Sequence, residues 1–555
     1  MTARRTLLLL ATLLHAAIAD GRAGGVATEH AFAAAAGAEM LRGGGTVVDA
    51  AIAAAAVVCV VHAASCGIGG GGFALVHRAR GKDGADGDDL ALDYRERAPA
   101  GATLDRFRVE GQLDASLLRT GGLAVAVPGE VAGWAVLHRR LGRLPLTRVL
   151  EPAIRLARDG FSLADAPHLG REVVRAAPLL AADPGLREVF LGGGETAPGP
   201  DFRVVQSDLA RTLEAIATHG PRAFYAGGVA RAIADAARAR GGVLTTDDLA
   251  RYRPVWRRAL VGRVGRRRVV TFPPPGSGGV ILEILGLLAH DDLPALGAGS
   301  ATLLHLLASA MAQGFADRAR WYGDPDFTPV PVKELLAPAR LAALRARMSA
   351  VRVYSPASDL RTDGGTAHVS VIDAEGNAAA ITTTINTGFG SGIMVPGTGI
   401  ILNNEMDDFA LAPGVANVYG LTGAAANAVA PGKRPQSSMS PTIVLSHARP
   451  ELVVGGSGGP TIISGTLQVL LGVTAHGLDV RAAVDAPRIH DQGVGPALGV
   501  EEGVDPDVRR ILGRLGHRAS IVPAFGAVAA AGVSPDGAVS AAGDRRKDGG
   551  EAIVP

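Results

Sequence analysis

The chain has 555 residues, of which 48% are hydrophobic and 19% charged, and its formal net charge is +2. This length allows two or three ordinary domains or one large α/β unit. The near-neutral charge, without a basic block, argues against nucleic acid or a strongly charged surface as a partner. The 75 glycines and 33 prolines are spread among apolar runs, which indicates many tight turns rather than disorder.

The N-terminus predicts export. "MTARR" is a positive segment, "TLLLLATLLHAAI" is an apolar segment too short to span a bilayer comfortably, and "AIA" at Ala17–Ala19 has the form of a signal-peptidase site. We therefore expect residues 1–19 to be a cleaved signal peptide, a mature chain starting near Asp20, and a periplasmic or secreted protein. An uncleaved N-terminal anchor is the alternative. No later run is long, apolar and glycine-free enough to predict a membrane span.

Two cysteines, Cys59 and Cys66, lie in or next to one apolar stretch. Their number excludes a compact disulfide scaffold in a chain of this length. We expect two buried free thiols. A local bridge formed in an oxidising compartment is the alternative.

In chain order, residues 27–64 are Ala-rich and predict helices, and "CGIGGGGFALVHRA" predicts a glycine turn followed by a strand. "LALDYRERAP" predicts another strand. Helical patterns then dominate from 128 to about 320, including "TTDDLARY", which opens with a capping threonine. After 366, strands alternate with turns, and helices return at "IISGTLQVLLGVTAHG" and "DPDVRRILGRLG". A mostly helical first part thus precedes a strand-rich second part, with the border at "DGGTAHVSVID".

Two glycine motifs suggest other chemistry. "GIGGGG" at Gly67–Gly72 matches a dinucleotide fingerprint only formally, because a helix precedes it and a strand follows, which is the reverse of the required order. "GGSGG" at Gly455–Gly459 lies between a strand and a helix, as a nucleophile elbow requires. A serine hydrolase using Ser457, with Asp479 and then His490 or His517, is therefore a rival interpretation.

Metal chemistry is not expected. No cluster of His, Cys, Asp and Glu has zinc spacing, and "NNEMDDF" at Asn403–Phe409 lacks the spacing of a calcium loop. That segment is either a polar turn that ends a strand or a cage for an ammonium group.

Several long motifs occur in the order found in γ-glutamyltranspeptidases. These are "EMLRGGGTVVDAAIA", "DYRERAP", "VPGEVAGW", "FPPPGSGGV", "ADRARWYGDPDF", "DGGTAHVSVID", "TTTINTGFGSGI", "GIILNNEMDDFA", "GKRPQSSMSPTIV" and "SGGPTII". The chain resembles that family over nearly its whole mature length.

The resemblance implies a four-layer αββα sandwich of the N-terminal nucleophile hydrolase type, formed as one precursor. It also implies self-cleavage between Gly365 and Thr366, which would leave a large subunit of residues 20–365 and a small subunit of 366–555 that together form one domain and remain a heterodimer. Gly364 and Gly365 would let the backbone bend toward the Thr366 hydroxyl.

A free N-terminal threonine carries both its nucleophile and its base. An α-amino group has an unperturbed pKa of about 7.7–8.0, so it can accept a proton from the hydroxyl of the same residue near neutral pH. Thr366 is therefore the expected nucleophile.

The resemblance implies the remaining roles position by position. Thr384 would hydrogen-bond the nucleophile, and the N–H groups of Gly458 and Gly459 would form the oxyanion hole. The α-carboxylate of a γ-glutamyl group would be held by Arg95, Ser437 and Ser438. Its α-ammonium would be held by Asn386, Glu405 and Asp408. Neither a cofactor nor a metal is implied.

We therefore expect an exported γ-glutamyltransferase and glutathione hydrolase that passes the γ-glutamyl group to water, an amino acid or a dipeptide. "SGGP" stands where the family commonly has "PGGS", which makes a special role for Ser457 less expected. Asp408 is retained, which argues against the cephalosporin-acylase branch. An unprocessed, inactive γ-glutamyl-binding protein is the alternative that is not an enzyme.

Overall fold

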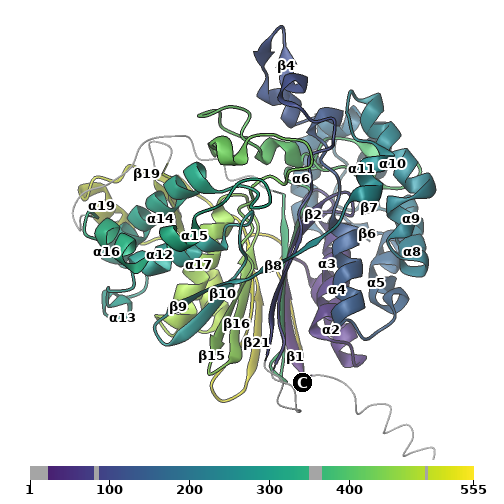
Figure 1. Ribbon diagram of the computed structural model, residues 1–555. Helices are drawn as coiled ribbons and strands as arrows, with labels where there is room; N and C mark the ends of the chain where they lie inside the picture. Colours follow the sequence, from purple (N-terminus) through teal and green to yellow (C-terminus); the bar gives the residue numbers. More distant parts are fainter. Residues whose placement is uncertain (1–22, 80–86, 349–364, 494–497) are drawn as a thin grey trace, which may run out of the picture.

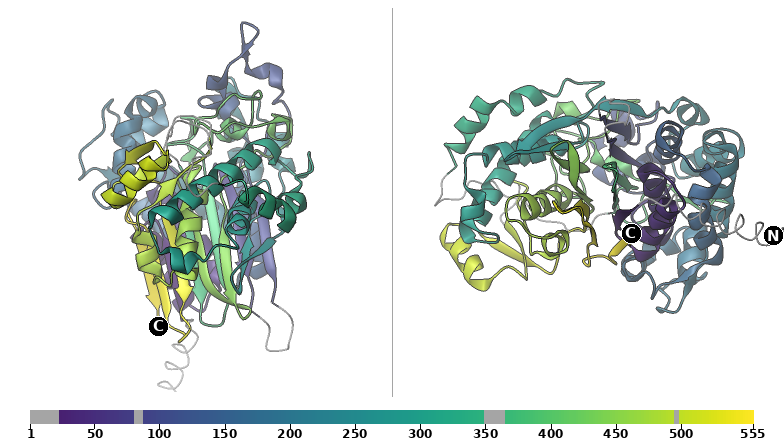
Figure 2. Two further views of the ribbon diagram at one scale, coloured as in Figure 1. Left: turned by 90° about the vertical axis from the view of Figure 1, so that its left-hand side faces the viewer. Right: turned by 90° about the horizontal axis from the view of Figure 1, so that it is seen from below.

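The computed structural model describes residues 23–79, 87–348, 365–493 and 498–555 (Figure 1). The predicted signal peptide and Gly364 lie outside the described residues. Two β-sheets stand face to face, and helices cover the outer face of each (Figures 1 and 2). This arrangement confirms the predicted four-layer αββα sandwich.

Both sheets are antiparallel and both take strands from either side of Thr366. In the described chain the first sheet has the order β22 (Gly550–Val554), β1 (Gly24–Thr28), β11 (Ala367–Asp373), β12 (Ala378–Thr384), β2 (Gly71–His77), β3 (Asp89–Tyr94) and β8 (Val255–Arg258). The second has the order β21 (Val539–Gly543), β20 (Val528–Val533), β16 (Arg449–Gly456), β15 (Thr442–Ser446), β10 (Arg267–Thr271) and β9 (Leu260–Val264).

The helix-rich first part was predicted correctly in its helices, but strands β8, β9 and β10 were missed within it. These strands are rich in arginine and only partly buried, so they lack a continuous apolar run. Strands β8 and β10 pair with strands from distant parts of the sequence, β3 and β15, while β9 pairs with the neighbouring β10. A local pattern does not report such long-range pairing.

Helices form the two outer layers. Beside the first sheet lie α2 (Ala31–Arg42), α3 (Val47–Val61), α4 (Glu130–Leu141), α5 (Leu146–Asp159), α6 (Pro167–Ala181), α7 (Pro184–Leu191), α8 (Ser207–His219), α9 (Arg222–Tyr225), α10 (Gly227–Ala239) and α11 (Thr246–Arg251). Beside the second lie α12 (Gly278–Leu287), α13 (Leu293–Leu296), α14 (Ala301–Trp321), α15 (Val332–Leu335), α16 (Pro338–Arg345), α17 (Thr461–Thr474), α18 (Val480–Asp485) and α19 (Pro506–Arg514). Short strands complete the chain: β4 (Arg108–Val109), β5 (Gln112–Leu113), β6 (Phe161–Ser162), β7 (Arg203–Val204), β13 (Met394–Val395), β14 (Ile400–Ile401), β17 (Ile489–His490), β18 (Leu498–Glu501) and β19 (Ala519–Val522).

The sequence of α3 explains its position. Every residue of α3 is buried, because a helix that is apolar all round, apart from Asp49 in its first turn, must be covered on all sides. A capping box between Thr46 and Asp49 fixes its start, and the predicted threonine cap of α11 is confirmed at Thr245. Between the sheets, small alanines and large apolar side chains interdigitate, and the rings of Phe73 and Phe272 stack with centroids 4.2 Å apart.

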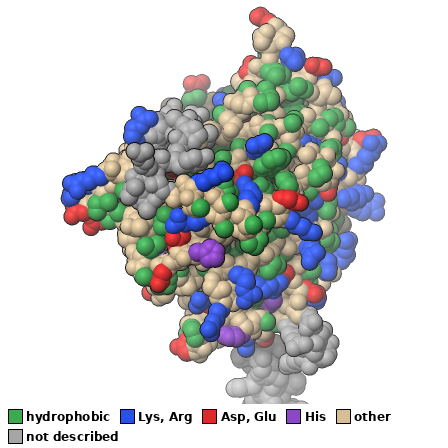
Figure 3. Space-filling view, turned by 60° about the vertical axis from the view of Figure 1, so that its left-hand side comes forward, with side chains coloured by type: hydrophobic (Ala, Val, Ile, Leu, Met, Phe, Trp, Pro, Cys, Tyr) green, Lys and Arg blue, Asp and Glu red, His purple; other side chains and the backbone are tan. Residues whose placement is uncertain are grey.

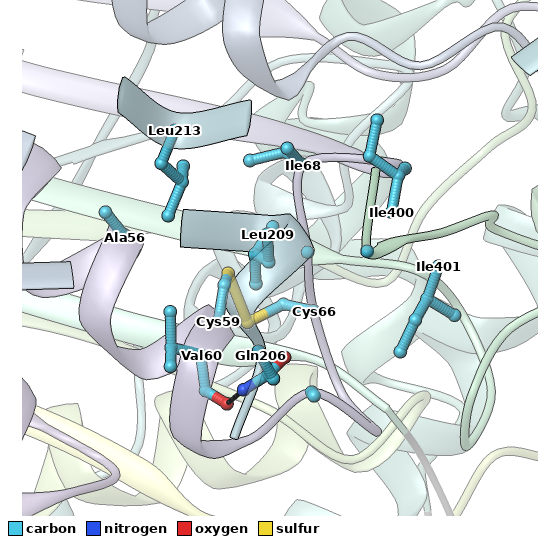
Figure 4. Close-up of a pocket in the computed structure, with 13 residues that line it drawn as sticks. Ala56, Cys59, Val60, Cys66, Ile68, Gln206, Leu209, Leu213, Ile400 and Ile401 are labelled. Carbon is cyan, nitrogen blue, oxygen red and sulfur yellow. Dashed lines mark hydrogen bonds between the residues drawn. A yellow bond between two sulfur atoms is a disulfide. The ribbon is translucent and has the colours of Figure 1, made fainter. Parts of the chain in front are cut away.

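The expectation of two free thiols is wrong: Cys59 and Cys66 form a disulfide. After α3 ends, a tight turn brings the Cα atoms of the two cysteines to 4.9 Å, within the range that a disulfide spans. The bridge borders a pocket lined by apolar side chains that include Leu209, Leu213 and Ile400 (Figure 4). The sequence spacing did not reveal this turn.

Charged side chains lie among hydrophobic ones on the face drawn in Figure 3. On this face Lys and Arg are more prominent than Asp and Glu. In the part of the chain that the structure describes, no helix combines the length and the apolar character needed to cross a membrane.

Glu130 at the start of α4 generates a stability prediction. The side chain is fully buried, Thr383 Oγ1 donates to its Oε2 at 2.6 Å, and burial raises its pKa to about 8. A glutamate in the unfolded chain has a pKa of about 4.3, so the folded protein must take up a proton here at every pH between these values. Glu130→Gln removes that penalty, and we expect the free energy of unfolding to rise by about 2–3 kcal/mol at pH 7.

Urea unfolding at several pH values measures this effect. The gain should shrink as the pH falls and vanish near pH 4, where both states carry the proton. Exposed Glu195→Gln is the matched control and should change little. A gain for Glu130→Gln that is the same at pH 4 and pH 8 would contradict the titration argument.

Candidate active site

The hairpin of β11 and β12 sets the position of Thr366. Its register pairs Ala367 with Thr383, and one step further along the same antiparallel register Thr366 faces Thr384. The turn between the two strands is short, which fixes this register. The Oγ1 atoms of Thr366 and Thr384 are 3.3 Å apart. The predicted contact between the two threonines is therefore present.

Both threonine hydroxyls converge on the carbonyl of the residue before Thr366. Thr366 Oγ1 donates to the oxygen of Gly365, and Thr384 Oγ1 donates to the same oxygen at 2.9 Å. The hydroxyl of Thr384 also accepts a hydrogen bond from Asn386 N at 2.8 Å. The candidate nucleophile, Thr366 Oγ1, and a second hydrogen-bond donor, Thr384 Oγ1, thus both contact the peptide group between Gly365 and Thr366.

Gly365 is needed here for space. A Cβ atom on this residue would lie 2.9 Å from the carbonyl oxygen of Asn386 and 3.1 Å from those of Ala64 and Thr387. A side chain would therefore push the peptide away from the Thr366 hydroxyl. The sequence argument expected a flexible bend, and the structure shows a crowded approach instead.

One buried pocket collects nearly all the predicted site residues. Its lining includes Arg95, Thr366, Thr384, Asn386, Glu405, Asp408, Ser437, Ser438 and Gly459, together with Tyr419, Met439 and Ile462. These residues come from the end of β3, from β12, from the 3₁₀ turn Glu405–Asp408 and from the loops before β15 and α17. Gly458 precedes Gly459 but is not part of this lining.

Arg95 is the electrostatic centre of the pocket. It follows β3, is fully buried, and places its Nη1 2.5 Å from Glu405 Oε1 and its Nη2 2.5 Å from Asp408 Oδ2. Burial lowers the pKa of Arg95, but the charges of Glu405, Glu96 and Asp408 outweigh burial and raise it. Its guanidinium therefore stays charged and holds the two acids that were predicted to face an ammonium group.

Burial also perturbs the acids around Arg95. It raises the pKa of Glu405 well above its ordinary value, against the opposing charge of Arg95. Burial likewise raises the pKa of the neighbouring Glu96 to about 7, again opposed by Arg95. Glu405 Oε2 has no hydrogen-bond partner among the described residues. Glu96, beside Arg95, can therefore bind or release a proton near neutral pH.

Gly458 and Gly459 form the turn between β16 and α17. Their φ angles are +111° and +59°, a region that glycine adopts readily. No described group accepts a hydrogen bond from either N–H. A Cβ on Gly459 would lie 2.8 Å from the ring of Tyr419, so the turn requires glycine for space as well.

The structure does not assemble the rival serine site. Ser457 lies between a strand and a helix as expected, but its Oγ has no hydrogen-bond partner among the described residues. His490 contacts Ser464 and Gln492, and His517 contacts His305. A nucleophile needs a base within hydrogen-bond reach, and Ser457 has none in the described chain. Among the described residues, no group of acidic, histidine and cysteine side chains could hold a metal ion.

Lys547 is a site residue that sequence reasoning missed. From the loop before β22, its Nζ donates to the carbonyl oxygen of Thr366 at 2.7 Å and contacts Glu29 Oε2 at 2.7 Å. The contacts of Lys547 and His62 outweigh burial and hold the pKa of Glu29 below its usual range. Glu29 in turn accepts from His368 N, so this ion pair supports the start of β11.

Tyr419 and Arg318 were missed as well. Tyr419 covers one side of the pocket and donates from its hydroxyl to Asn386 O at 2.8 Å. Arg318 lies behind Ser438 on α14. The local sequence around Tyr419 is typical of a surface loop. The sequences around Arg318 and Lys547 are typical of charged residues on a helix and in a turn. A local sequence signal for these three contacts does not exist, because each depends on a distant segment.

Comparison with known proteins finds the same family that the sequence motifs indicate. The Gamma-glutamyltranspeptidase family model matches residues 33–554. The glutathione hydrolase proenzyme of Escherichia coli K12 is 40% identical over 497 residues, which cover 88% of this chain and 84% of that protein. The acylase ACY 1 proenzyme of Pseudomonas sp. strain V22 is 37% identical over 544 residues, with coverage of 96% and 93%. The crystal structure of cephalosporin acylase from Bacillus halodurans superposes with a TM-score of 0.84 at 29% identity and covers 96% of each chain.

The contacts of Lys547 predict that removing its charge lowers the stability of the folded protein. Lys547→Met leaves the fully buried Glu29 without its partner, so we expect the free energy of unfolding to fall by about 3 kcal/mol at pH 7. Because the pKa of Glu29 is lowered in the fold, the pair contributes above the ordinary pKa of glutamate and its contribution is lost as the pH falls through the folded value.

Chemical denaturation of single and double variants tests this prediction. Glu29→Gln combined with Lys547→Met should recover at least half of the loss, because the unpaired buried carboxylate is gone. Exposed Arg545→Met is the control from the same loop. If the double variant were as unstable as the sum of the single variants, the pair would not be the cause.

Proposed function

Because this chain belongs to the γ-glutamyltranspeptidase family, we propose that it is an exported γ-glutamyltransferase and glutathione hydrolase that matures by cleaving itself before Thr366. One observation carries the proposal. The Thr366 hydroxyl lies against the carbonyl of Gly365 in a buried pocket that also holds charges of both signs. The proenzyme names of the relatives support maturation by processing.

Self-cleavage needs only groups already in contact. Thr366 Oγ1 attacks the carbonyl carbon of Gly365, while Thr384 Oγ1 donates to the carbonyl oxygen, which becomes negative. The C–N bond breaks, and the proton lost by the Thr366 hydroxyl passes to the Thr366 nitrogen, which leaves as an amine, so that an ester joins Gly365 to the threonine side chain. Water then hydrolyses the ester. It releases a carboxylate on Gly365 and a free α-amine and hydroxyl on Thr366.

The same atoms then serve turnover. The α-amine of Thr366 accepts the proton of its own hydroxyl, and Oγ1 attacks the side-chain amide of a γ-glutamyl donor. The N–H groups of Gly458 and Gly459, which have no described acceptor, stabilise the oxyanion. The amine product leaves with a proton, and a γ-glutamyl ester remains on Thr366. Water yields glutamate, whereas an amino acid or a dipeptide yields a new γ-glutamyl amide.

The charges of the pocket match the zwitterionic head of the donor. Asp408, Glu405 and Asn386 face its α-ammonium, and Arg95 with the two serines faces its α-carboxylate. Without a donor, Arg95 pairs with Glu405 and Asp408, so no charge is left unpaired among these three. A γ-linked glutamyl group presents a free α-amine and a free α-carboxylate together with a scissile amide at its side chain.

An acylase is the second candidate, because several of the similar proteins carry that name. The lining of the pocket favours the first proposal. Charged and polar side chains surround Thr366, and the apolar members of the lining are few. An acyl group that lacks an ammonium would gain nothing from Asp408.

Thr366→Ala tests both maturation and turnover. We expect wild-type protein to give two bands on a denaturing gel, the smaller one starting at Thr366, and the variant to give one band. A chromogenic γ-glutamyl anilide, assayed with and without glycylglycine, measures hydrolysis and transfer, and the variant should show neither. Ser457→Ala is the matched control and should cleave and turn over normally. Two bands and wild-type turnover from Thr366→Ala would refute the proposal.

Asp408→Asn tests recognition of the ammonium. Loss of one charged contact should lower kcat/KM for the anilide by about 10–100-fold, mainly through KM, because the contact is made before and during reaction. The neighbouring Asp407→Asn is a matched control, since Asp407 accepts from Val418 N and does not line the pocket. Equal losses in both variants would show damage to the 3₁₀ turn rather than a lost contact.

A further inference from the structure

Arg318 is a buried cation without a carboxylate partner. It lies on α14 and is 2% exposed, and its guanidinium contacts two serine hydroxyls but no carboxylate in the described part of the chain. Arg95, by contrast, forms ion pairs with three carboxylates, those of Glu96, Glu405 and Asp408. Burying a charge without a counter-charge costs folding free energy. Where such a charge lies next to a binding pocket, it indicates that a bound ligand supplies the counter-charge.

The contacts of Arg318 lead to the serine pair. Its Nε donates to Ser277 Oγ at 2.9 Å, and its Nη2 donates to Ser438 Oγ at 3.3 Å. The hydroxyl of Ser277 in turn donates a hydrogen bond to the carbonyl oxygen of Ser437 at 2.5 Å. Arg318 therefore holds both the backbone of Ser437 and the side chain of Ser438.

These contacts determine where the serine protons point. Ser438 Oγ accepts from Arg318, and Ser437 Oγ accepts from Met439 N at 3.2 Å. A hydroxyl has one proton, and no described group accepts it from either serine. Both serines line the pocket, so both protons are available to an acceptor inside it. A carboxylate is an acceptor-only group that takes two such bonds.

The charge of Arg318 persists at neutral pH. Burial lowers its pKa to about 10, and the charge of Asp408 opposes this effect. The guanidinium thus adds a positive field behind two oriented donors, in a site where low solvent access strengthens it.

We propose that Arg318 is a positioning residue that makes the site select donors with a free α-carboxylate, because it orients the Ser438 hydroxyl and supplies the positive charge behind it. This inference rests on the proposed function. It assigns to α14 a specificity role that acts through Ser438 rather than by direct contact with the donor.

Two donors test the inference: a γ-glutamyl anilide with a free α-carboxylate and its α-carboxamide analogue. Both are assayed with wild-type enzyme and with Arg318→Met. We expect wild-type enzyme to prefer the carboxylate, and Arg318→Met to reduce that ratio of kcat/KM values by about tenfold or more, mainly through KM for the carboxylate donor. Turnover of the carboxamide should change less than threefold by the same argument.

Controls separate specificity from damage. Arg320→Met changes an exposed arginine on the same helix and should leave the ratio unchanged. A denaturing gel reports whether each variant has cleaved itself. If Arg318→Met lowered kcat/KM by the same factor for both donors, the role of Arg318 would be only structural, and the inference would be overturned. If wild-type enzyme turned over neither donor, the proposed function itself would fail, and the inference with it.

A conservative variant covers the case in which Arg318→Met does not fold. Arg318→Lys keeps the charge but loses the planar fork, so it should lower the ratio by an intermediate factor. Ser438→Ala should also lower the ratio, and the double variant with Arg318→Lys should lose little more than Ser438→Ala alone, because the two residues act in series. The inference would be overturned by an unchanged ratio in Arg318→Lys, or by a double variant whose ratio falls by the product of the two single effects.

Discussion

The register of one antiparallel hairpin is the constraint on which the site depends. Pairing of β11 with β12 places Thr366 opposite Thr384, and both hydroxyls then reach the carbonyl oxygen of Gly365. A shift by one residue would turn Thr384 to the other face of the sheet and remove this contact. The apolar core on both faces of the first sheet makes such a shift costly, so core packing fixes the geometry of the candidate nucleophile.

The charges of the pocket are arranged around the same point. Arg95 binds the acids that we propose for ammonium recognition, while Arg318 holds the serines that we propose for carboxylate recognition. Arg95 is ion-paired with these acids, whereas Arg318 contacts no carboxylate in the described part of the chain. Such a pocket is stable when empty, yet it still has an unmatched positive charge for an anionic group. Lys547 and Glu29 add a further buried pair directly behind Thr366.

Both sheets are shared by the segments before and after Thr366. Strands β1, β2, β3 and β8 pair in one sheet with β11, β12 and β22, and β9 and β10 join the other sheet through β15. A cut at the proposed position therefore separates no layer from its neighbours. The interleaved strands and the common core would keep the two pieces together without a covalent link, since the hydrophobic contacts do not depend on that bond.

Sequence motifs by themselves determined the family, the four-layer fold, most helices and most of the residues that line the pocket, because these depend on local patterns and on long matching motifs. They could not determine the disulfide between Cys59 and Cys66, the arginine-rich strands β8 to β10, or the roles of Lys547, Arg318 and Tyr419. The disulfide depends on the local turn that follows α3, while the pairing of β8 and β10 and the contacts of Lys547, Arg318 and Tyr419 join segments far apart in the chain. Such contacts are decided only when the two sheets pack, because packing alone brings a distant side chain within hydrogen-bond reach of Thr366 or Ser438.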